Sequence, residues 1–251
     1  MFSFARWQRT EPVTAAVPRS VRVYAIGDIH GRLDLLDAML DQLVEDGAAA
    51  PDLNKYIVYL GDYVDRGPDS SGVIERLVQG PPPGFGAIHL KGNHEASMLH
   101  FLEDIRIGPN WLSYGGDATL ASYQVPPPGE NAGAAELEQA QALLYAALPP
   151  NHLAFLTSLR ASVAIGDYLF VHAGIRPGVA LERQREEDLL WIREQFLRST
   201  ADHGKVVVHG HTISVAPEVR ANRIGIDTGA FATNRLTCLV LEGNDRRFLY
   251  T

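Results

Sequence analysis

Cysteine and long apolar stretches are scarce in this chain, and their scarcity limits the classes of protein to which it can belong. Its 251 residues include one cysteine, Cys238, which excludes an internal disulfide. Because Cys238 lies in the apolar run 236–241, we expect a buried and inert thiol. No apolar run approaches the roughly 18 residues that span a bilayer, and residues 1–20 lack the continuous apolar core of a signal peptide. These absences predict a cytoplasmic protein with no membrane partner.

Positive charge is also scarce. The chain has 22 Lys and Arg residues against 30 Asp and Glu residues, which gives a formal net charge of −8 at pH 7. This balance argues against a nucleic-acid partner, because nucleic-acid-binding domains usually carry an excess of basic side chains. It does not exclude a phosphate ester as substrate, since bound cations would reverse the local field at the site that holds them.

No linker-like stretch divides the chain, so its length fits one large domain. We expect a flexible N-terminal extension over residues 1–20 and a single domain over residues 21–251. The hydrophobic content of 46% is enough for an ordinary globular core. The sequence shows no regulatory domain, and no regulatory subunit is evident from it.

The spacing of apolar residues predicts an α/β fold. In the first half, three short apolar runs that read as strands each precede a segment with helical apolar spacing. The second half is richer in strands, with a hairpin around Gly166-Asp167 and one helix at 185–199. We therefore expect two packed sheets with helices outside them. The expected strands are 21–26, 56–60, 87–90, 162–165, 168–171, 206–208, 223–226, 236–242 and 247–250.

Residues 105–150 break the alternation of strands and helices. They contain Trp111, the pair Gly115-Gly116 and a run of three prolines at 126–128, followed by a stretch rich in Ala, Glu and Gln. We predict that this segment is a helical insertion lying over the functional site.

Five short motifs put carboxylate, imidazole and amide groups directly after expected strands. Such groups point to one composite site, because open α/β sheets bind ligands beyond the carboxyl ends of their strands. A ligand set of this kind without thiolate favours Mn, Fe, Zn or Ni. The motifs are Gly27-Asp28-Ile29-His30-Gly31, Gly61-Asp62-Tyr63-Val64-Asp65-Arg66-Gly67, Gly92-Asn93-His94-Glu95, Val171-His172-Ala173-Gly174 and Val208-His209-Gly210-His211-Thr212.

The order of these motifs resembles the phosphoprotein phosphatase family of calcineurin-like metallophosphoesterases. The pattern Trp-Leu-x-Tyr-Gly-Gly-x-x-x-Leu at 111–120 is similar to that of bacterial members, and so indicates the bacterial serine/threonine protein phosphatase type. The resemblance implies a four-layer α/β/β/α sandwich with two mixed β-sheets. It also implies a metal-dependent phosphomonoester hydrolase.

The resemblance further implies two divalent metal ions, which we expect to be manganese, with Fe, Zn or Ni as alternatives. A hydroxide bridging the two ions would attack phosphorus in line, because metal coordination lowers the pKa of water to about 7. The implied ligands are Asp28 and His30 for the first ion, Asp62 as the bridge, and Asn93, His172 and His211 for the second ion.

Phosphate binding and proton donation fall to other residues of the motifs. Arginine offers paired donors to phosphate oxygens, so Arg66 and, by resemblance, Arg193 are expected to bind the phosphate together with Asn93. A salt bridge on a helix face is the alternative role for Arg193. His94 would protonate the leaving group as general acid, and Asp65 would orient the His94 ring.

Two details of the downstream motifs remain open from the sequence. His209 and His211 compete for one ligand position, and the resemblance favours His211. Many metallophosphoesterases carry a further histidine two residues later, but here that position is Ile213, which fits the protein-phosphatase branch better than a nuclease. The segment 227–230, Asp-Thr-Gly-Ala, is expected to support the metal loops, although turn formation explains it nearly as well.

The substrate is less clearly indicated than the chemistry. The leading hypothesis is a serine/threonine protein phosphatase, with phosphotyrosine as a further target, whose partner is a phosphorylated protein or a small phosphoester. The alternative is a symmetrical dinucleoside tetraphosphate hydrolase, but residues 111–150 contain no Lys or Arg to bind additional phosphates. A third hypothesis is a metal-binding interaction module without catalysis; the presence of the acid, the bridge and the arginine argues against it.

Overall fold

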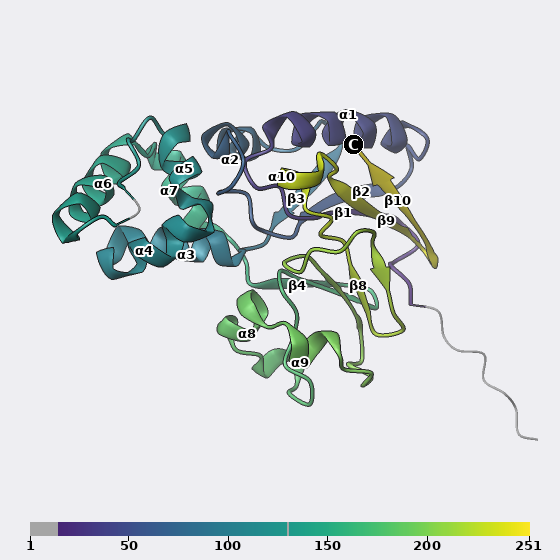
Figure 1. Cartoon of the computed structure of the whole chain (residues 1–251). Coiled ribbons are helices and arrows are strands. Elements are labelled where there is room, and N and C mark those ends of the chain that lie inside the picture. Colours follow the sequence, from purple (N-terminus) through teal and green to yellow (C-terminus); the bar gives the residue numbers. More distant parts are fainter. Residues whose placement is uncertain (1–14, 130) are drawn as a thin grey trace, which may run out of the picture.

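The computed structural model describes residues 15–129 and 131–251, whose strands form two five-stranded sheets with helices on the outer faces (Figure 1). The strands are β1 (Val21–Ile26), β2 (Asn54–Tyr59), β3 (Phe85–His89), β4 (Ser162–Ile165), β5 (Tyr168–Val171), β6 (Val206–His209), β7 (Glu218–Val219), β8 (Arg223–Gly225), β9 (Thr237–Glu242) and β10 (Asp245–Tyr250). The helices are α1 (Leu33–Ala48), α2 (Ser70–Val78), α3 (Asn93–Glu103), α4 (Gly108–Trp111), α5 (Asp117–Ser122), α6 (Ala134–Ala147), α7 (Pro150–Ser158), α8 (Glu186–Trp191), α9 (Glu194–Leu197) and α10 (Ala230–Thr233).

Both sheets are mixed. The first has the order β10-β9-β1-β2-β3, in which β1, β2 and β3 are parallel and β9 runs antiparallel to β1. The second has the order β4-β5-β6-β8-β7, in which β5, β6 and β8 are parallel and the predicted hairpin forms the antiparallel pair β4 and β5. Because the parallel strands point the same way within each sheet, the loops after them gather along one edge.

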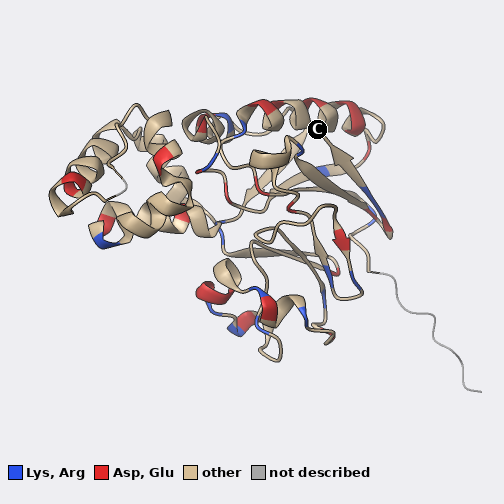
Figure 2. Cartoon of the chain, viewed as in Figure 1, with Lys and Arg blue, Asp and Glu red and all other residues tan. Residues whose placement is uncertain are grey.

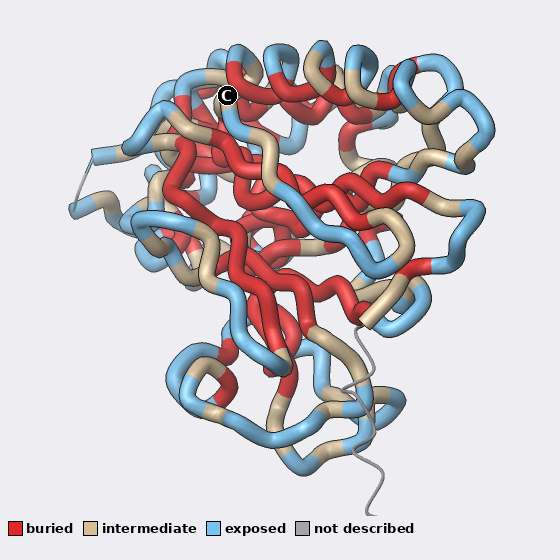
Figure 3. The backbone as a smooth tube through the Cα atoms, turned by 90° about the vertical axis from the view of Figure 1, so that its right-hand side faces the viewer, coloured by how far each residue is buried: buried red, intermediate tan, exposed pale blue. Residues whose placement is uncertain are grey.

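The layers follow from which face of each strand is apolar. Between the sheets lies a core that includes Val23, Val58, Phe170 and Ile224. A larger core lies between the first sheet and helices α1 and α2, and a smaller one lies between the second sheet and helices α8 and α9. Figure 3 shows the buried strands running through the centre, with exposed backbone outside them. The predicted four-layer α/β/β/α sandwich is confirmed.

Helix α1 illustrates why these residues form these elements. Its buried side chains include Leu36, Met39, Leu40 and Leu43, which recur at the three- and four-residue spacing of one helix face. Helix α2 is capped at its N-terminus by Asp69, whose carboxylate accepts a hydrogen bond of 2.7 Å from the Gly72 N–H. These two helices cover the first sheet and place the loops before them at the carboxyl ends of β1 and β2.

The expected insertion is mainly helical in the described part of the chain. Short turns at Ile105–Ile107 and Leu112–Gly116 join α3 to α4 and α4 to α5, and α6 and α7 follow. This group of helices lies beside the sandwich (Figure 1). Its aromatic residues Trp111 and Tyr123 are buried, whereas Tyr114 is 48% exposed. None of the described helices is long and apolar enough to cross a bilayer.

The structure corrects two expectations. The single helix expected at 185–199 is two short helices, α8 and α9, because the backbone is extended at the buried residue Ile192 and non-helical at Arg193. Residues 1–14 of the expected flexible extension lie outside the described residues, but residues 15–20 pack on the sandwich. Val17 is buried between the sheets, and its N–H donates a hydrogen bond of 2.9 Å to the Gly243 carbonyl. Cys238 is buried and free, as expected.

Candidate active site

Loops from the ends of both sheets meet at one buried centre, where the backbone adopts unusual conformations. Of the seven described non-glycine residues with positive φ, five lie in these loops. Such conformations are costly for residues other than glycine and cluster where function over-determines the backbone. The five are His30 (47°), Asp62 (52°), Asp65 (73°), Arg66 (69°) and His211 (61°).

Asp62 lies at the middle of the centre. Its carboxylate is shared by two groups of potential metal ligands, His30 with His94 on one side and His172 with His211 on the other. Asp62 Oδ2 lies 3.5 Å from His30 Nε2, and Asp62 Oδ1 lies 3.4 Å from His172 Nε2. A carboxylate with one oxygen toward each group has the geometry that a bridge between two cations requires.

Backbone carbonyls fix the orientation of two histidines. His30 Nδ1 donates to the Val64 carbonyl at 2.8 Å, and His172 Nδ1 donates to the Leu60 carbonyl at 2.9 Å. In each ring the other nitrogen, Nε2, therefore faces the centre and carries the lone pair, which is the arrangement typical of metal-binding histidines. Asn93 Oδ1 lies 2.9 Å from His172 Nε2, so its amide oxygen faces the same position.

Burial keeps these imidazoles neutral. It lowers the pKa of His30 to about 3 and the pKa of His211 to about 2. A histidine that binds a metal must be neutral, so both rings are in the required form near pH 7. We refer to the six residues that the sequence predicts as metal ligands as the ligand cluster: Asp28, His30, Asp62, Asn93, His172 and His211.

Asp28 belongs to neither of the two groups of potential ligands that share Asp62, but its surroundings fit a cation. Its Oδ2 accepts the His211 N–H at 3.0 Å, whereas its buried Oδ1 has no hydrogen-bond partner. Burial, and then the carboxylates of Asp227 and Asp62, raise the pKa of Asp28 well above its ordinary value. A buried cluster of carboxylates with an unpaired oxygen lacks positive charge, which divalent ions would supply. The residues present therefore fit two such ions.

The structure separates the two competing histidines. His211 Nδ1 lies 3.2 Å from His172 Nε2 and faces the centre. His209 is buried but points elsewhere, with Nδ1 donating to the Gly210 carbonyl at 3.1 Å and Nε2 lying 3.3 Å from Arg223 Nη1. The choice of His211 over His209 therefore agrees with the geometry.

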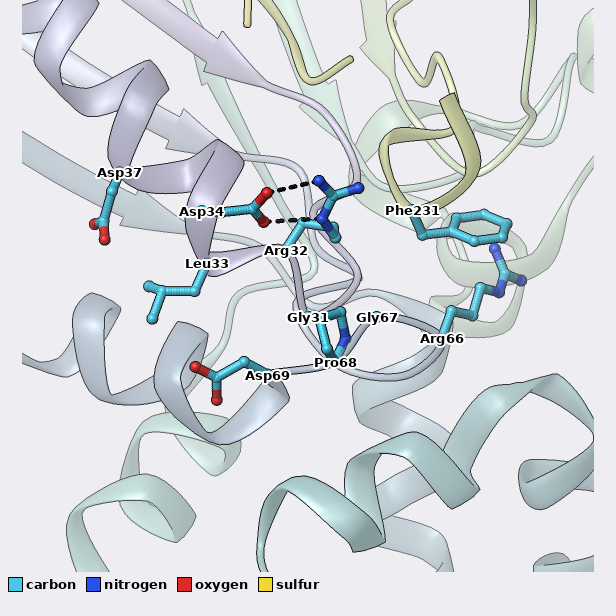
Figure 4. A pocket seen from close by; sticks show the side chains of 10 residues that line it. All are labelled: Gly31, Arg32, Leu33, Asp34, Asp37, Arg66, Gly67, Pro68, Asp69 and Phe231. Carbon is cyan, nitrogen blue, oxygen red and sulfur yellow. Dashed lines mark hydrogen bonds and ion pairs between the residues drawn. The ribbon is translucent and has the colours of Figure 1, made fainter. Parts of the chain in front are cut away.

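The guanidinium of Arg66 reaches the same centre. Its Nη1 lies 2.9 Å from His30 Nε2, and its Nη2 lies 3.1 Å from His94 Nε2. The ring of Phe231 stacks on it, with 4.8 Å from the guanidinium carbon to the ring centroid. Figure 4 shows this stacked pair at one side of a pocket of about 600 Å³. A cation bound at His30 Nε2 would replace this contact of the arginine side chain.

His94 and Asp65 form a buried pair. His94 Nδ1 lies 2.6 Å from Asp65 Oδ2, and His94 Nε2 lies 3.8 Å from Asp62 Oδ2. Although burial lowers it, the nearby carboxylates of Asp62 and Asp65 raise the pKa of His94 above its ordinary value. The pair can therefore hold a protonated imidazole whose Nε2 faces the centre.

Arg193 lies at the break between α8 and α9. Its Nη1 donates to the His211 carbonyl at 3.2 Å and to Thr212 Oγ1 at 3.4 Å. The neighbouring Glu194 pairs instead with Arg198. These contacts place Arg193 beside the ligand cluster rather than in a salt bridge on a helix face.

Glu95 lies in the third motif and has a role that is not evident from the sequence. Its buried carboxylate accepts the N–H groups of Asp62 and Gly92, both at 2.9 Å, and those of Tyr63 and Val64 at 2.7 and 3.2 Å. It thus ties the second motif to the third. The available signal was its place at the third position of helix α3, where glutamate commonly folds back onto backbone donors.

Comparison with known proteins agrees with the site. The model of the calcineurin-like phosphoesterase family matches residues 21–235. Serine/threonine-protein phosphatase 2 of Escherichia coli (strain K12) is 28% identical over 226 residues, covering 86% of this chain and 90% of the relative. The asymmetrical bis(5'-nucleosyl)-tetraphosphatase PrpE of Oceanobacillus iheyensis is 27% identical over 226 residues, covering 86% and 87%. The crystal structure of a candidate diadenosine tetraphosphatase superposes with a TM-score of 0.61 at 22% identity, covering 95% of each chain. The chain belongs to the calcineurin-like phosphoesterase family, which confirms the resemblance seen in its motifs.

Proposed function

We propose that this metallophosphoesterase is a phosphomonoesterase that acts on phosphoserine and phosphothreonine in proteins. The observation that carries the proposal is the shared position of Asp62, with one oxygen toward each half of the ligand cluster and with Arg66 and His94 facing the same centre. Two divalent ions bound there would supply the charge neutralisation and the water activation that phosphoester hydrolysis needs. Manganese remains our proposal for those ions.

The chain's own residues supply binding and proton transfer. Arg66, aided by Arg193, presents paired N–H donors to the phosphate oxygens, which the Asn93 amide also contacts. Hydrolysis breaks the bond between phosphorus and the ester oxygen, and water supplies the oxygen that replaces it. The departing oxygen takes the proton from His94 Nε2, while Asp65 keeps the opposite ring nitrogen protonated.

Charge around the centre favours a substrate with one phosphate over one with several. Among the described residues of the insertion at 105–150, the only basic side chain is that of Arg106 (Figure 2). The pocket beside Arg66 is lined by three carboxylates, Asp34, Asp37 and Asp69, and by Arg32, whose guanidinium is paired with Asp34 at 2.6 Å. A polyphosphate chain would meet repulsion there, whereas a peptide would not.

A second candidate is hydrolysis of dinucleoside polyphosphates, and the observation that favours it is the similarity to relatives named for that activity. The names of these relatives specify asymmetrical cleavage, whereas the alternative expected from the motifs is the symmetrical type. The two candidates share the same centre and differ in what surrounds it. An assay on both substrate classes therefore separates them.

The test uses the purified, metal-stripped chain with Mn²⁺ added back. Substrates are p-nitrophenyl phosphate, a phosphothreonine peptide and diadenosine tetraphosphate, and His94→Asn is assayed in parallel. We expect metal-dependent turnover of the peptide that falls roughly 10²- to 10⁴-fold in His94→Asn, the usual contribution of a general acid. Cleavage of the dinucleotide alone would favour the second candidate. Absence of turnover with any metal would contradict both.

A further inference from the structure

One motif is left unexplained by the metal chemistry. The segment 111–119, which we call the clamp segment, joins α4 to α5 and reaches the centre without contributing a metal ligand. Its buried side chains Trp111 and Thr119 are both 0% exposed. A tryptophan N–H and a threonine hydroxyl with no access to water must find partners in the protein. Both find the same partner, the Asp65 carboxylate.

The carboxylate of Asp65 is held by three donors. Thr119 Oγ1 donates to Asp65 Oδ1 at 2.6 Å. Trp111 Nε1 lies 3.2 Å from Oδ1 and 3.0 Å from Oδ2, so the indole N–H bridges both oxygens. The third donor is His94 Nδ1, at 2.6 Å from Oδ2. Two of the three donors therefore come from the clamp segment, and the third is the ring of the proposed general acid.

The donor and the acceptor can be assigned in each hydrogen bond of the Thr119 hydroxyl. Thr119 has one proton, which it donates to Asp65, so it acts as acceptor in its other contacts. It accepts the Asp65 backbone N–H at 2.8 Å and the hydroxyl of Ser70 at 3.0 Å. Thr119 thus holds both the backbone and the side chain of Asp65, whose own φ of 73° lies in the left-handed region that few residues other than glycine adopt.

The paired glycines of the motif serve the same contact. A side chain at Gly116 would lie 2.5 Å from the Trp111 ring, so only glycine lets the indole lie against this turn. Gly115 has φ of 104°, and its carbonyl accepts the Arg66 N–H at 3.1 Å. The clamp segment therefore fixes the two adjacent residues Asp65 and Arg66, one beside the acid and one beside the phosphate position.

These contacts have a geometric consequence for His94. A carboxylate bonded only to the imidazole can rotate about its own bonds, and the ring can rotate with it. A carboxylate whose two oxygens are bridged by the indole and bonded by the hydroxyl has one orientation, so the ring that it binds has one as well. Preorganisation of this kind matters most for a group that must meet a proton acceptor at about 2.6–3.2 Å.

We propose that Trp111 and Thr119 are positioning residues that hold Asp65 so that His94 Nε2 points at the leaving-group oxygen. This inference rests on the proposed function, in which His94 is the proton donor. It gives the helical insertion a part in catalysis that is separate from substrate selection.

The experiment compares leaving groups. Proton donation helps a strongly basic leaving group, such as phenolate with a conjugate-acid pKa of about 10, far more than a weakly basic one such as dinitrophenolate. We would measure kcat/KM on phenyl phosphate and on 2,4-dinitrophenyl phosphate for the wild type, Thr119→Val, Trp111→Phe and His94→Asn. The ratio of the two values in one preparation does not depend on the fraction of protein that is folded.

We expect Thr119→Val and Trp111→Phe each to lower kcat/KM on phenyl phosphate by about 10-fold, which is part of the effect of losing the acid entirely. On dinitrophenyl phosphate we expect a change within about twofold, since that leaving group needs no proton. Thr119→Ser retains the hydroxyl and should restore the wild-type ratio. The matched control Ser122→Ala removes a hydroxyl of α5 that bonds Ser71 N–H rather than Asp65, and should leave the ratio unchanged.

The outcomes separate this inference from the proposed function. Equal losses on both substrates in Thr119→Val and Trp111→Phe, with unequal losses in His94→Asn, would overturn the positioning role and leave the acid role standing. Equal losses in His94→Asn as well would overturn the acid role, and with it this inference. Unequal losses in all three variants support both.

Discussion

The ligand cluster and the clamp segment meet at neighbouring residues of one loop, but they shape the centre in different ways. The residues of the ligand cluster lie in loops that follow strands, or at the first turn of a helix, and the lone pairs of their side chains face the centre. The clamp segment is mainly helical, and its Trp111 and Thr119 donate N–H and O–H hydrogen bonds to the Asp65 carboxylate. The difference shows that a residue type with evident metal chemistry can be recognised in a sequence, whereas a supporting donor looks like core until its partner is known.

The strongest way to break the ligand cluster is to remove the carboxylate that both halves share. We expect Asp62→Asn, or chelation of the wild type, to reduce phosphoesterase activity to background, because one neutral amide cannot neutralise two divalent ions. Metal content by mass spectrometry and turnover of p-nitrophenyl phosphate measure the effect. The control Asp52→Asn, at an exposed position, should retain both. An Asp62→Asn protein that holds two ions and turns over normally would contradict the assignment.

A smaller effect is expected at two histidines that are two residues apart, and it tests which of them belongs to the ligand cluster. His211→Asn should bind about one ion in place of two, because it loses a ring nitrogen that faces the centre. His209→Asn should keep the full metal content and lose only stability, because its ring faces Arg223 and the backbone. Isothermal titration with Mn²⁺ compares the two proteins. The reverse pattern would show that His209 is the ligand.

The next prediction concerns Glu95, which holds the loops of the second and third motifs together. Glu95→Gln replaces a carboxylate that accepts four backbone N–H groups, and should weaken Mn²⁺ binding about 10- to 100-fold, as is usual when a group that orients metal ligands is changed. Activity at saturating metal should recover most of the loss. Titration of activity with Mn²⁺ gives the apparent affinity, with Glu103→Gln on the exposed side of the same helix as control. An unchanged affinity would show that the loops hold their shape without Glu95.

The smallest expected effect lies where helix α7 meets the first sheet. His89 stacks on Tyr59 with 4.9 Å between ring centroids and contacts Phe155 of α7. Burial lowers the pKa of His89 to about 4 from the ordinary 6.5. Between these values the unfolded chain binds the proton more readily, so the contribution of His89 to stability is present above pH 6.5 and is lost as the pH falls toward 4.

Urea unfolding at pH 7 and pH 5 should therefore show a smaller loss of stability on acidification for His89→Phe than for the wild type. The exposed position His100 supplies the control His100→Phe, which should follow the wild type. The ligand cluster is not involved, so metal content should stay constant in every protein. An equal loss for wild type and His89→Phe would show that the protonation of His89 does not affect the packing of helix α7 on the sheet.

The sequence predicted the α/β class, the mixed sheets and nearly every strand within two residues, because burial on a pleated surface leaves a clear apolar pattern. It failed at the helix expected over 185–199, where apolar spacing continues through a break. That break is made by tertiary packing of Ile192, and it turns Arg193 toward the His211 loop. A local pattern cannot reveal it, because the extended backbone there is stabilised by residues distant in sequence.

What the sequence by itself determined is the chemistry that can occur here: the residue types of the ligand cluster, their order after strands, and the arginine and histidine beside them. These follow from side-chain identity and short spacings, which need no knowledge of the fold. Only the tertiary structure decided which oxygen of Asp62 faces which histidine, and that His209 points away from the centre. It also decided that Glu95, Trp111 and Thr119 form hydrogen bonds with the loops of the site. Those outcomes depend on contacts between segments up to about a hundred residues apart, and packing of the whole chain fixes them.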